Sequence, residues 1–135
     1  MEGKLEVRPD HVLAMLTGSL SVPMFLQALP EILDLAANSG LHLILLDWSG
    51  VEGPITTGQR VEMGKFGAAQ VLKRTWGKPP KIAVVAPFPL NNGLEEAVAT
   101  NLGVNARAFL DKQQALDWFG IASRTDDDIV PGTQI

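Results

Sequence analysis

The segment that most constrains the fold is an almost continuous apolar run of eight residues, Leu41–Trp48. A membrane-spanning helix needs about 20 apolar residues, so this run is too short for one. A strand with one face in water would instead alternate apolar and polar residues. Leu41–Trp48 is therefore predicted to be the central strand of a sheet that is covered on both faces. Lys81–Ala86 is predicted to be a second buried strand.

Helix and turn signals alternate with these strands. The expected elements are strands 4–8 and 11–17 joined at a Pro-Asp turn, a helix from Ser19 or Ser21 to about residue 38 with a kink at Pro30, strand 41–48, loop 49–53, helix 57–76, strand 81–86, helix 94–102, strand 104–110 and helix 111–119. The order β-β-α-β-α-β-α-β-α predicts an α/β fold, with a mixed sheet and four helices packed on it. Residues 1–120 are expected to form one domain, and 121–135 a flexible acidic C-terminal tail.

Composition excludes several classes of protein. Of the 135 residues 46% are hydrophobic, which is enough for a packed core, and none is cysteine. Disulfides, thiolate metal sites and a cysteine nucleophile are therefore excluded. The net charge of −4 does not suggest nucleic-acid binding. The N-terminus lacks an apolar signal core, so a cytoplasmic location is expected.

The residues needed for catalysis do not occur together. His11 and His42 each stand at the start of a strand, with no second metal ligand two or four residues on. No phosphate-binding glycine loop is present. Glu95 and Glu96 are adjacent and diverge on a helix, so they are expected to supply favourable charge in its first turn. The sequence thus predicts no enzyme activity, no cofactor and no metal.

The segment 60–81 is basic, although the chain is acidic. It holds six cations and a single acid, Glu62, and this predicts a basic surface on the predicted helix 57–76. Helical spacing places one set of residues on the sheet: Val61, Gly64, Ala68, Val71, Leu72 and Thr75. The opposite side is predicted to carry Met63, Phe66 and Gln70, with Arg60, Lys73 and Arg74 at its flanks.

An exposed Met and Phe among cations is typical of a binding surface. Such a surface suits an acidic protein or anionic lipid headgroups at a membrane surface. The alternative is that a neighbouring element or a dimer mate covers Met63 and Phe66. Trp48, at the end of the central strand, is expected either to line a pocket or to belong to the core.

Thr56 and Thr57 stand at the predicted start of the same helix. Backbone N–H groups at a helix N-terminus lack partners within the helix, so they can bind a phosphate or carboxylate. The alternative is that a hydroxyl simply caps the helix. The first interpretation makes this turn a candidate anion site.

The segment Leu46-Asp47-Trp48-Ser49-Gly50-Val51, followed by Thr56-Thr57-Gly58, resembles the STAS domain. In that family a central strand ends in Leu-Asp-Leu-Ser-Gly-Val, and an Asp-Ser-Ser-Gly motif opens the second helix. The ending Ala115-Leu116-Asp117-Trp118 resembles the SpoIIAA-like branch. The resemblance implies that Thr57 occupies the position phosphorylated in anti-sigma-factor antagonists, although Ile55 replaces the acidic residue of the motif.

The resemblance implies a non-catalytic regulatory module that engages a protein partner, kinase-like or sigma-regulatory. The expected surface is the loop after the central strand and the outer face of the second helix. The alternative is a module that binds a small apolar, anionic or lipidic molecule near that helix. The candidate residues for either function are Trp48, Ser49, Thr56, Thr57, Gly58, Arg60, Met63, Phe66 and Arg74.

Overall fold

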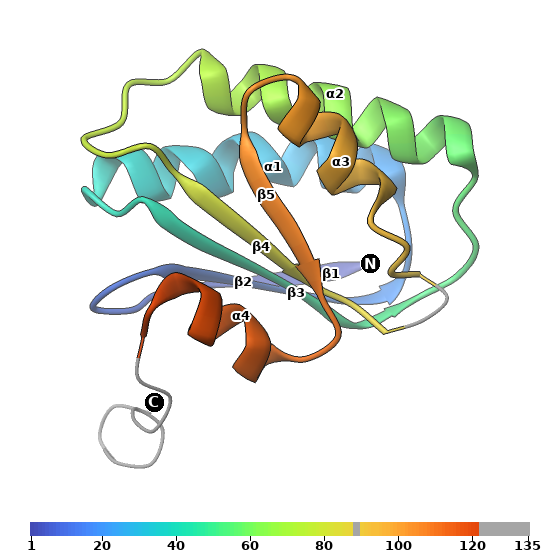
Figure 1. The fold of residues 1–135 in the computed structure, drawn as a ribbon. Helices are drawn as coiled ribbons and strands as arrows, with labels where there is room; N and C mark the ends of the chain where they lie inside the picture. Colours follow the sequence, from blue (N-terminus) through green and yellow to red (C-terminus); the bar gives the residue numbers. More distant parts are fainter. Residues whose placement is uncertain (88–89, 122–135) are drawn as a thin grey trace.

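Five strands form one mixed sheet in the computed structural model, which describes residues 1–87 and 90–121 (Figure 1). The spatial order of the strands follows the chain, and the strands are β1 (Glu2–Val7), β2 (Val12–Ser19), β3 (Leu43–Glu52), β4 (Lys81–Val85) and β5 (Asn105–Phe109). β1 is antiparallel to β2, and the remaining neighbours pair in parallel. The helices are α1 (Val22–Asn38), α2 (Thr57–Leu72), α3 (Leu94–Asn101) and α4 (Lys112–Phe119). The predicted α/β fold and element order are confirmed.

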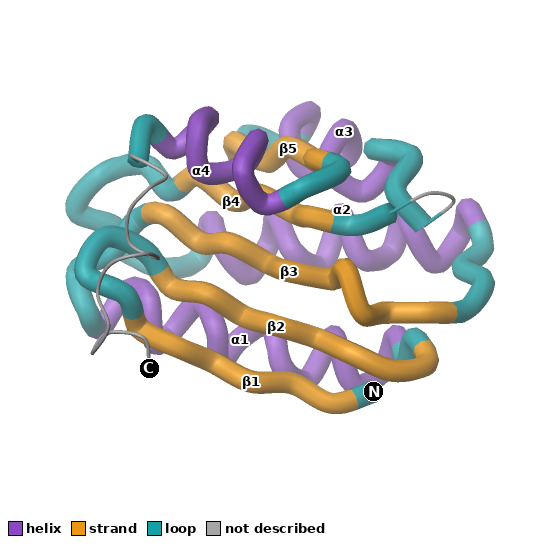
Figure 2. Tube along the Cα trace, turned by 90° about the horizontal axis from the view of Figure 1, so that it is seen from below, coloured by secondary structure: helices purple, strands orange, loops and turns teal. Residues whose placement is uncertain are grey.

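The helices form two unequal layers on the sheet (Figure 2). The three crossover helices α1, α2 and α3 lie on one face of the sheet. Each of them connects two neighbouring parallel strands, and the chain moves along the sheet in the same direction each time. Because such crossovers are right-handed, all three helices are placed on the same face. α4 follows the last strand and covers part of the other face. The alternation of β3 reflects this arrangement: Ile44 and Leu46 join the core beneath α1–α3, whereas Leu43 and Leu45 pack with α4.

Some predicted boundaries differ from the structure. α2 ends at Leu72 rather than at Trp76. α1 runs as one helix through Pro30, as predicted. Leu29 and Leu33 are buried on either side of that proline, so tertiary packing holds the helix together there. The predicted tail lies, apart from Ile121, outside the described residues.

The predicted loop 49–53 is wrong, because β3 continues to Glu52. Met15 pairs with Asp47, but Thr17 pairs with Gly50, so β3 holds one extra residue between these pairs. This bulge breaks the alternation on which the sequence prediction relied. Val51 then returns to the core at 5% exposure. Gly50 has no Cβ, and a Cβ there would lie 2.8 Å from Cγ2 of Thr17, so the Thr17 side chain would have to shift.

The predicted faces of α2 are rotated relative to the observed ones. Met63 is 4% exposed and belongs to the core, whereas Leu72, expected on the sheet, is 57% exposed. α2 packs against α1 and α3 as well as the sheet, so its buried side is broader than the single stripe that the sequence predicted. Its outward face consists of the exposed residues Gly58, Glu62, Lys65, Ala69 and Leu72, followed by the exposed C-cap residue Lys73.

Two glycines of α2 should respond in opposite directions to substitution by alanine. At Gly64 a Cβ would lie 2.7 Å from the carbonyl oxygen of Glu95 and 2.9 Å from Cβ of Val98, so α3 would have to move. Gly64→Ala is expected to lower the free energy of unfolding by about 1–3 kcal/mol. At Gly67 the nearest atom is Cδ2 of Leu29 at 3.6 Å, an ordinary contact. Gly67→Ala should therefore raise the free energy of unfolding by about 0.5–1 kcal/mol, through helix propensity alone.

Urea denaturation of both variants tests this prediction. Equal effects at the two positions would show that α2 and α3 do not approach closely at Gly64.

Candidate functional site

The parallel strands β2–β5 end at the same edge of the sheet, and all four helices begin there. Ser21 and Asp111 cap α1 and α4 with their side-chain oxygens. Ligands and partners of open α/β sheets usually meet this carboxyl edge. The candidate residues Trp48, Ser49, Thr56, Thr57 and Gly58 all lie along this edge, at the end of β3 and the start of α2.

Asp47 stabilises the bulge of β3. Its Oδ1 accepts hydrogen bonds from the backbone N–H of Ser49 at 3.0 Å and from the Ser49 hydroxyl at 2.6 Å. Such local side-chain bonds favour turns over regular pairing. Lys112 of α4 lies 4.0 Å from the other carboxylate oxygen. The role of Asp47 in the Asp47-Trp48-Ser49 motif is therefore structural: its hydrogen bonds stabilise the bulge, where Ser49 is exposed.

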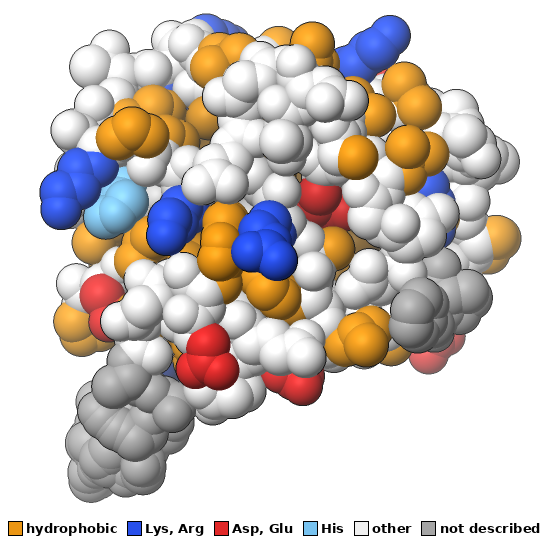
Figure 3. All heavy atoms as spheres, viewed as in Figure 1, with side chains coloured by type: hydrophobic (Ala, Val, Ile, Leu, Met, Phe, Trp, Pro, Cys, Tyr) orange, Lys and Arg blue, Asp and Glu red, His pale blue; other side chains and the backbone are white. Residues whose placement is uncertain are grey.

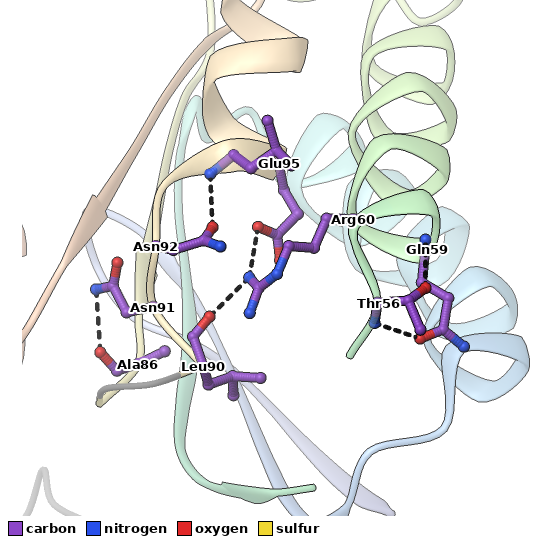
Figure 4. Close-up of polar contacts among 9 residues, drawn as sticks. Thr56, Gln59, Arg60, Ala86, Leu90, Asn91, Asn92 and Glu95 are labelled. Carbon is purple, nitrogen blue, oxygen red and sulfur yellow. Dashed lines mark hydrogen bonds and ion pairs between the residues drawn. The ribbon is translucent and has the colours of Figure 1, made fainter. Parts of the chain in front are cut away.

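Thr56 caps α2, as the simpler of the two sequence interpretations predicted. Its hydroxyl accepts from the Gln59 N–H at 3.0 Å, and the Gln59 side chain accepts from the Thr56 N–H at 2.9 Å (Figure 4). This reciprocal capping box uses the Thr56 hydroxyl. Thr57 is exposed, and its hydroxyl has no partner among the residues that the structure describes. Of the two threonines, Thr57 is thus the one available for modification.

Arg60 links α2 to the start of α3 (Figure 4). Its guanidinium donates to the carboxylate of Glu95 at 3.0 Å and to the carbonyl of Leu90 at 2.8 Å. The prediction that Arg60 flanks an exposed surface is wrong, since the residue is 5% exposed. The desolvated guanidinium is stabilised by these partners, and it fastens the segment before α3 to α2.

A cavity of about 70 Å³ lies beneath α1, α2 and α3. Trp48 lines it at 3% exposure, and Phe25 packs edge-on against the indole with ring centroids 5.1 Å apart. The indole Nε1 is buried and has no hydrogen-bond partner within the described part of the chain. Met63 lines the same cavity. Trp48 thus belongs to the core and also lines this cavity, so the structure does not separate the two sequence interpretations of this residue.

Glu96 also lines this cavity, at 9% exposure. Burial raises the pKa of its carboxyl group to about 7, and the neighbouring Glu95 contributes in the same direction. Its own backbone N–H and Arg60 act in the opposite direction. The two adjacent acids thus diverge as predicted, but only Glu95 is ion-paired.

The remaining candidates, Phe66 and Arg74, do not join these residues. Phe66 is half-buried against the core, and Arg74 donates to Asp34 of α1 at 2.7 Å and to Gln70. Arg60 and Arg74 are thus committed to structural contacts, and Lys81 lies over the ring of Trp118. On the face in Figure 3, Lys and Arg side chains are interspersed with hydrophobic and neutral ones. Fewer cations are therefore available for the predicted basic surface than the sequence indicated.

The histidines lie away from this site. Both precede strands, at the amino edge of the sheet, and Nδ1 of His11 is 2.8 Å from Oδ1 of Asp10. Burial, with Lys78 and Lys81 nearby, lowers the pKa of His42. Within residues 1–87 and 90–121 no group of three His, Asp or Glu side chains is placed to hold a metal ion.

Sequence reasoning missed the inward orientation of Glu96. Adjacent residues on a helix point about 100° apart, so one of the pair Glu95-Glu96 had to face away from Arg60. Ala99, three residues after Glu96, is buried and marks the packed face of α3. The spacing between Glu96 and Ala99 could have indicated that Glu96 faces inward. It involves only two residues, however, and acidic residues are common in the first turn of a helix for electrostatic reasons alone.

Two solved structures share this architecture. An anti-sigma factor antagonist from Mycobacterium paratuberculosis is 20% identical, with a TM-score of 0.56 over 87% of this chain and 92% of that one. An uncharacterised protein with a SpoIIAA-like fold from Shewanella loihica is 19% identical, with a TM-score of 0.52 over 87% and 91%. No family model and no curated protein matches the chain. These likenesses confirm the predicted STAS-type, SpoIIAA-like fold.

None of the described helices has the length and apolar character needed to cross a membrane.

Proposed function

We propose that this SpoIIAA-like chain is a non-catalytic regulatory module that binds a protein partner. The contact surface would be the exposed end of β3, the start of α2 and the outward face of α2 defined above. One observation carries the proposal: the exposed hydroxyls of Ser49 and Thr57 stand at the carboxyl edge of the sheet, beside a helix face that combines Lys65, Ala69 and Leu72. A mixed polar and apolar face of this kind suits a protein contact.

The position of the histidines supports a non-catalytic role. Acyl transfer by a hydroxyl requires a general base within hydrogen-bond reach. Ser49 and Thr57 lie at the carboxyl ends of the strands, whereas both histidines precede their strands at the opposite edge. The Asp47 carboxylate accepts the Ser49 hydroxyl hydrogen bond, but its other oxygen faces Lys112 rather than a histidine.

Site-specific photo-crosslinking in cells tests the surface. A benzophenone amino acid at Glu62, on the outward face of α2, is expected to give a discrete covalent adduct. The same group at Gln113, exposed on α4 across the sheet, is the matched control. Adducts at Gln113 alone, or equal adducts at both positions, would contradict the proposal.

Thr57 is expected to act as the regulatory position of that surface. Thr57→Ala should leave the free energy of unfolding within about 0.5 kcal/mol, because the side chain is exposed. It should also abolish any phosphate-dependent change in affinity for the cross-linked partner, because a phosphate adds charge beside the contact. Affinity is measured by titration before and after kinase treatment. An equal response of wild type and variant would exclude Thr57.

A second candidate function, a module for a small ligand, is favoured by the cavity lined by Trp48 and Met63. Phe66 does not line this cavity, and Arg60 is held by Glu95 rather than placed at an anionic headgroup.

A further inference from the structure

We infer that the cavity beneath α3 binds a small uncharged molecule with an apolar body and one carbonyl group, which accepts hydrogen bonds from the Trp48 indole N–H and the Glu96 carboxylic acid. This inference rests on the second candidate function and gives it a ligand class. It does not depend on the partner-binding surface of α2.

The first observation is the unpartnered indole. Buried N–H groups in native proteins almost always have a hydrogen-bond partner, and leaving one without a partner costs about 1–3 kcal/mol. Nε1 of Trp48 has none within the described residues, although the side chain is 3% exposed. The ring is held in place by Phe25 at 5.1 Å, so its N–H is a preorganised donor.

The second observation is the buried acid that shares the cavity. Glu96 lies on α3, and the strand residues that line the cavity with it, among them Leu46, Ile82 and Val84, are apolar. The charged groups near Glu96 are Arg60 on α2, Glu95 on its own helix and Arg107 of β5, which lines the outer groove beside α3. Arg60 is engaged with Glu95 and Leu90. Glu96 therefore keeps its proton to a higher pH than an ordinary glutamate, and its protonated form, which is a donor, predominates at pH 6.

Trp48 and Glu96 line one apolar space, and a ligand that reaches both donors there must carry an acceptor. A carbonyl oxygen has two lone pairs and can accept from both the indole N–H and the carboxylic acid. Burial disfavours the negative charge of the Glu96 carboxylate, and for the same reason it would disfavour an anionic ligand in this cavity. The ligand is therefore expected to be neutral.

The size of the cavity limits the ligand further. One water needs about 10–15 Å³, so a cavity of about 70 Å³ holds roughly five non-hydrogen atoms. A whole lipid acyl chain exceeds this volume. A water molecule in such a cavity normally has two to four polar partners, whereas the apolar lining favours an organic body around a single polar group.

The test uses 2-butanone as the probe and 2-methylbutane as its matched control, in which a methyl group replaces the carbonyl oxygen. Binding is followed by NMR through the indole N–H of Trp48 and the ε-methyl of Met63, assigned with Trp48→Phe and Met63→Leu. At pH 6, 2-butanone should shift both signals and leave the indoles of Trp76 and Trp118 in place. Trp76 already donates to the carbonyl of Val71 at 2.9 Å, and Trp118 lies on α4. The hydrocarbon should shift only the Met63 methyl.

Two variants test the individual donors. Trp48→Phe keeps an aromatic ring but loses the N–H, and it should weaken 2-butanone binding about five-fold, read from Met63. For the wild type, Kd should rise about ten-fold or more between pH 6 and pH 8.5, as Glu96 ionises. Glu96→Gln, whose amide is a donor at every pH, should remove this pH dependence.

Three results would overturn the inference. The first is no shift of Trp48 with tens of millimolar 2-butanone, including the case in which the indole shows exchange with a buried water alone. The second is equal binding by Trp48→Phe and wild type. The third is a pH dependence that persists in Glu96→Gln. Each leaves the photo-crosslinking result at Glu62 unaffected, so failure of this site is distinct from failure of the partner surface.

Discussion

Replacing Arg60 with methionine is expected to lower the free energy of unfolding by about 3–5 kcal/mol. The guanidinium is buried, and it donates to the carboxylate of Glu95 at 3.0 Å and to the carbonyl of Leu90 at 2.8 Å. Methionine replaces the apolar stem of the side chain but leaves both acceptors without this donor. Urea denaturation at pH 7 measures the loss.

Arg74→Met, two residues after the end of α2, is the matched control. Arg74 also pairs with an acid on a neighbouring helix, Asp34 at 2.7 Å. The Arg74 side chain is 12% exposed, but the Asp34 side chain is 61% exposed. The pair is expected to contribute about 0–1 kcal/mol, because water competes for the exposed carboxylate. If Arg74→Met and Arg60→Met lose the same stability, burial does not strengthen the Arg60 pair, and the account of how α3 is attached to α2 is wrong.

Glu96 should make the wild-type protein less stable as the pH rises. The pKa of its carboxyl group is about 7 in the folded state, compared with an ordinary value of 4.5. Between these values the folded protein holds a proton that the unfolded chain has released, so the free energy of unfolding falls with increasing pH. The full difference corresponds to on the order of 3 kcal/mol, with most of the loss between pH 5 and pH 7.

Glu96→Gln is expected to flatten this dependence, because the amide does not ionise. Denaturation curves at pH 5, 6, 7 and 8 compare the variant with wild type. Glu62→Gln, at an exposed position of α2, removes an acid without a change in burial and should keep the wild-type slope. An unchanged slope in Glu96→Gln would show that the carboxyl group reaches water in solution.

Much of the fold follows from local patterns in the sequence. The almost continuous apolar segment Leu41–Trp48 predicted a strand buried on both faces, and the strand lies at the centre of the sheet. The end of that strand was missed, since a bulge shifts the alternation at Ser49 and Gly50. A bulge depends on the register of the neighbouring strand, which periodicity within a single segment does not report.

The candidate site was predicted less well, because it depends on contacts between distant segments. The capping role of Thr56 is local and was among the sequence interpretations. Arg60 was placed at the flank of an exposed surface, and coverage of Met63 by a neighbouring element was only one of two interpretations. Both residues are buried, because α2 packs against other helices as well as the sheet. A helix with two packed neighbours buries a wider arc than a single sheet contact requires, so the hydrophobic pattern of α2 alone predicted the wrong face.

The strand order has a consequence for synthesis on the ribosome. Each strand of the sheet lies beside the one that precedes it in the chain, from β1 to β5. A nascent polypeptide can therefore extend the sheet stepwise, because each new strand pairs with the edge strand that was formed before it. No strand pair that has already formed has to separate so that a later strand can be inserted. N-terminal segments emerge first, so vectorial growth and the native topology are compatible throughout translation.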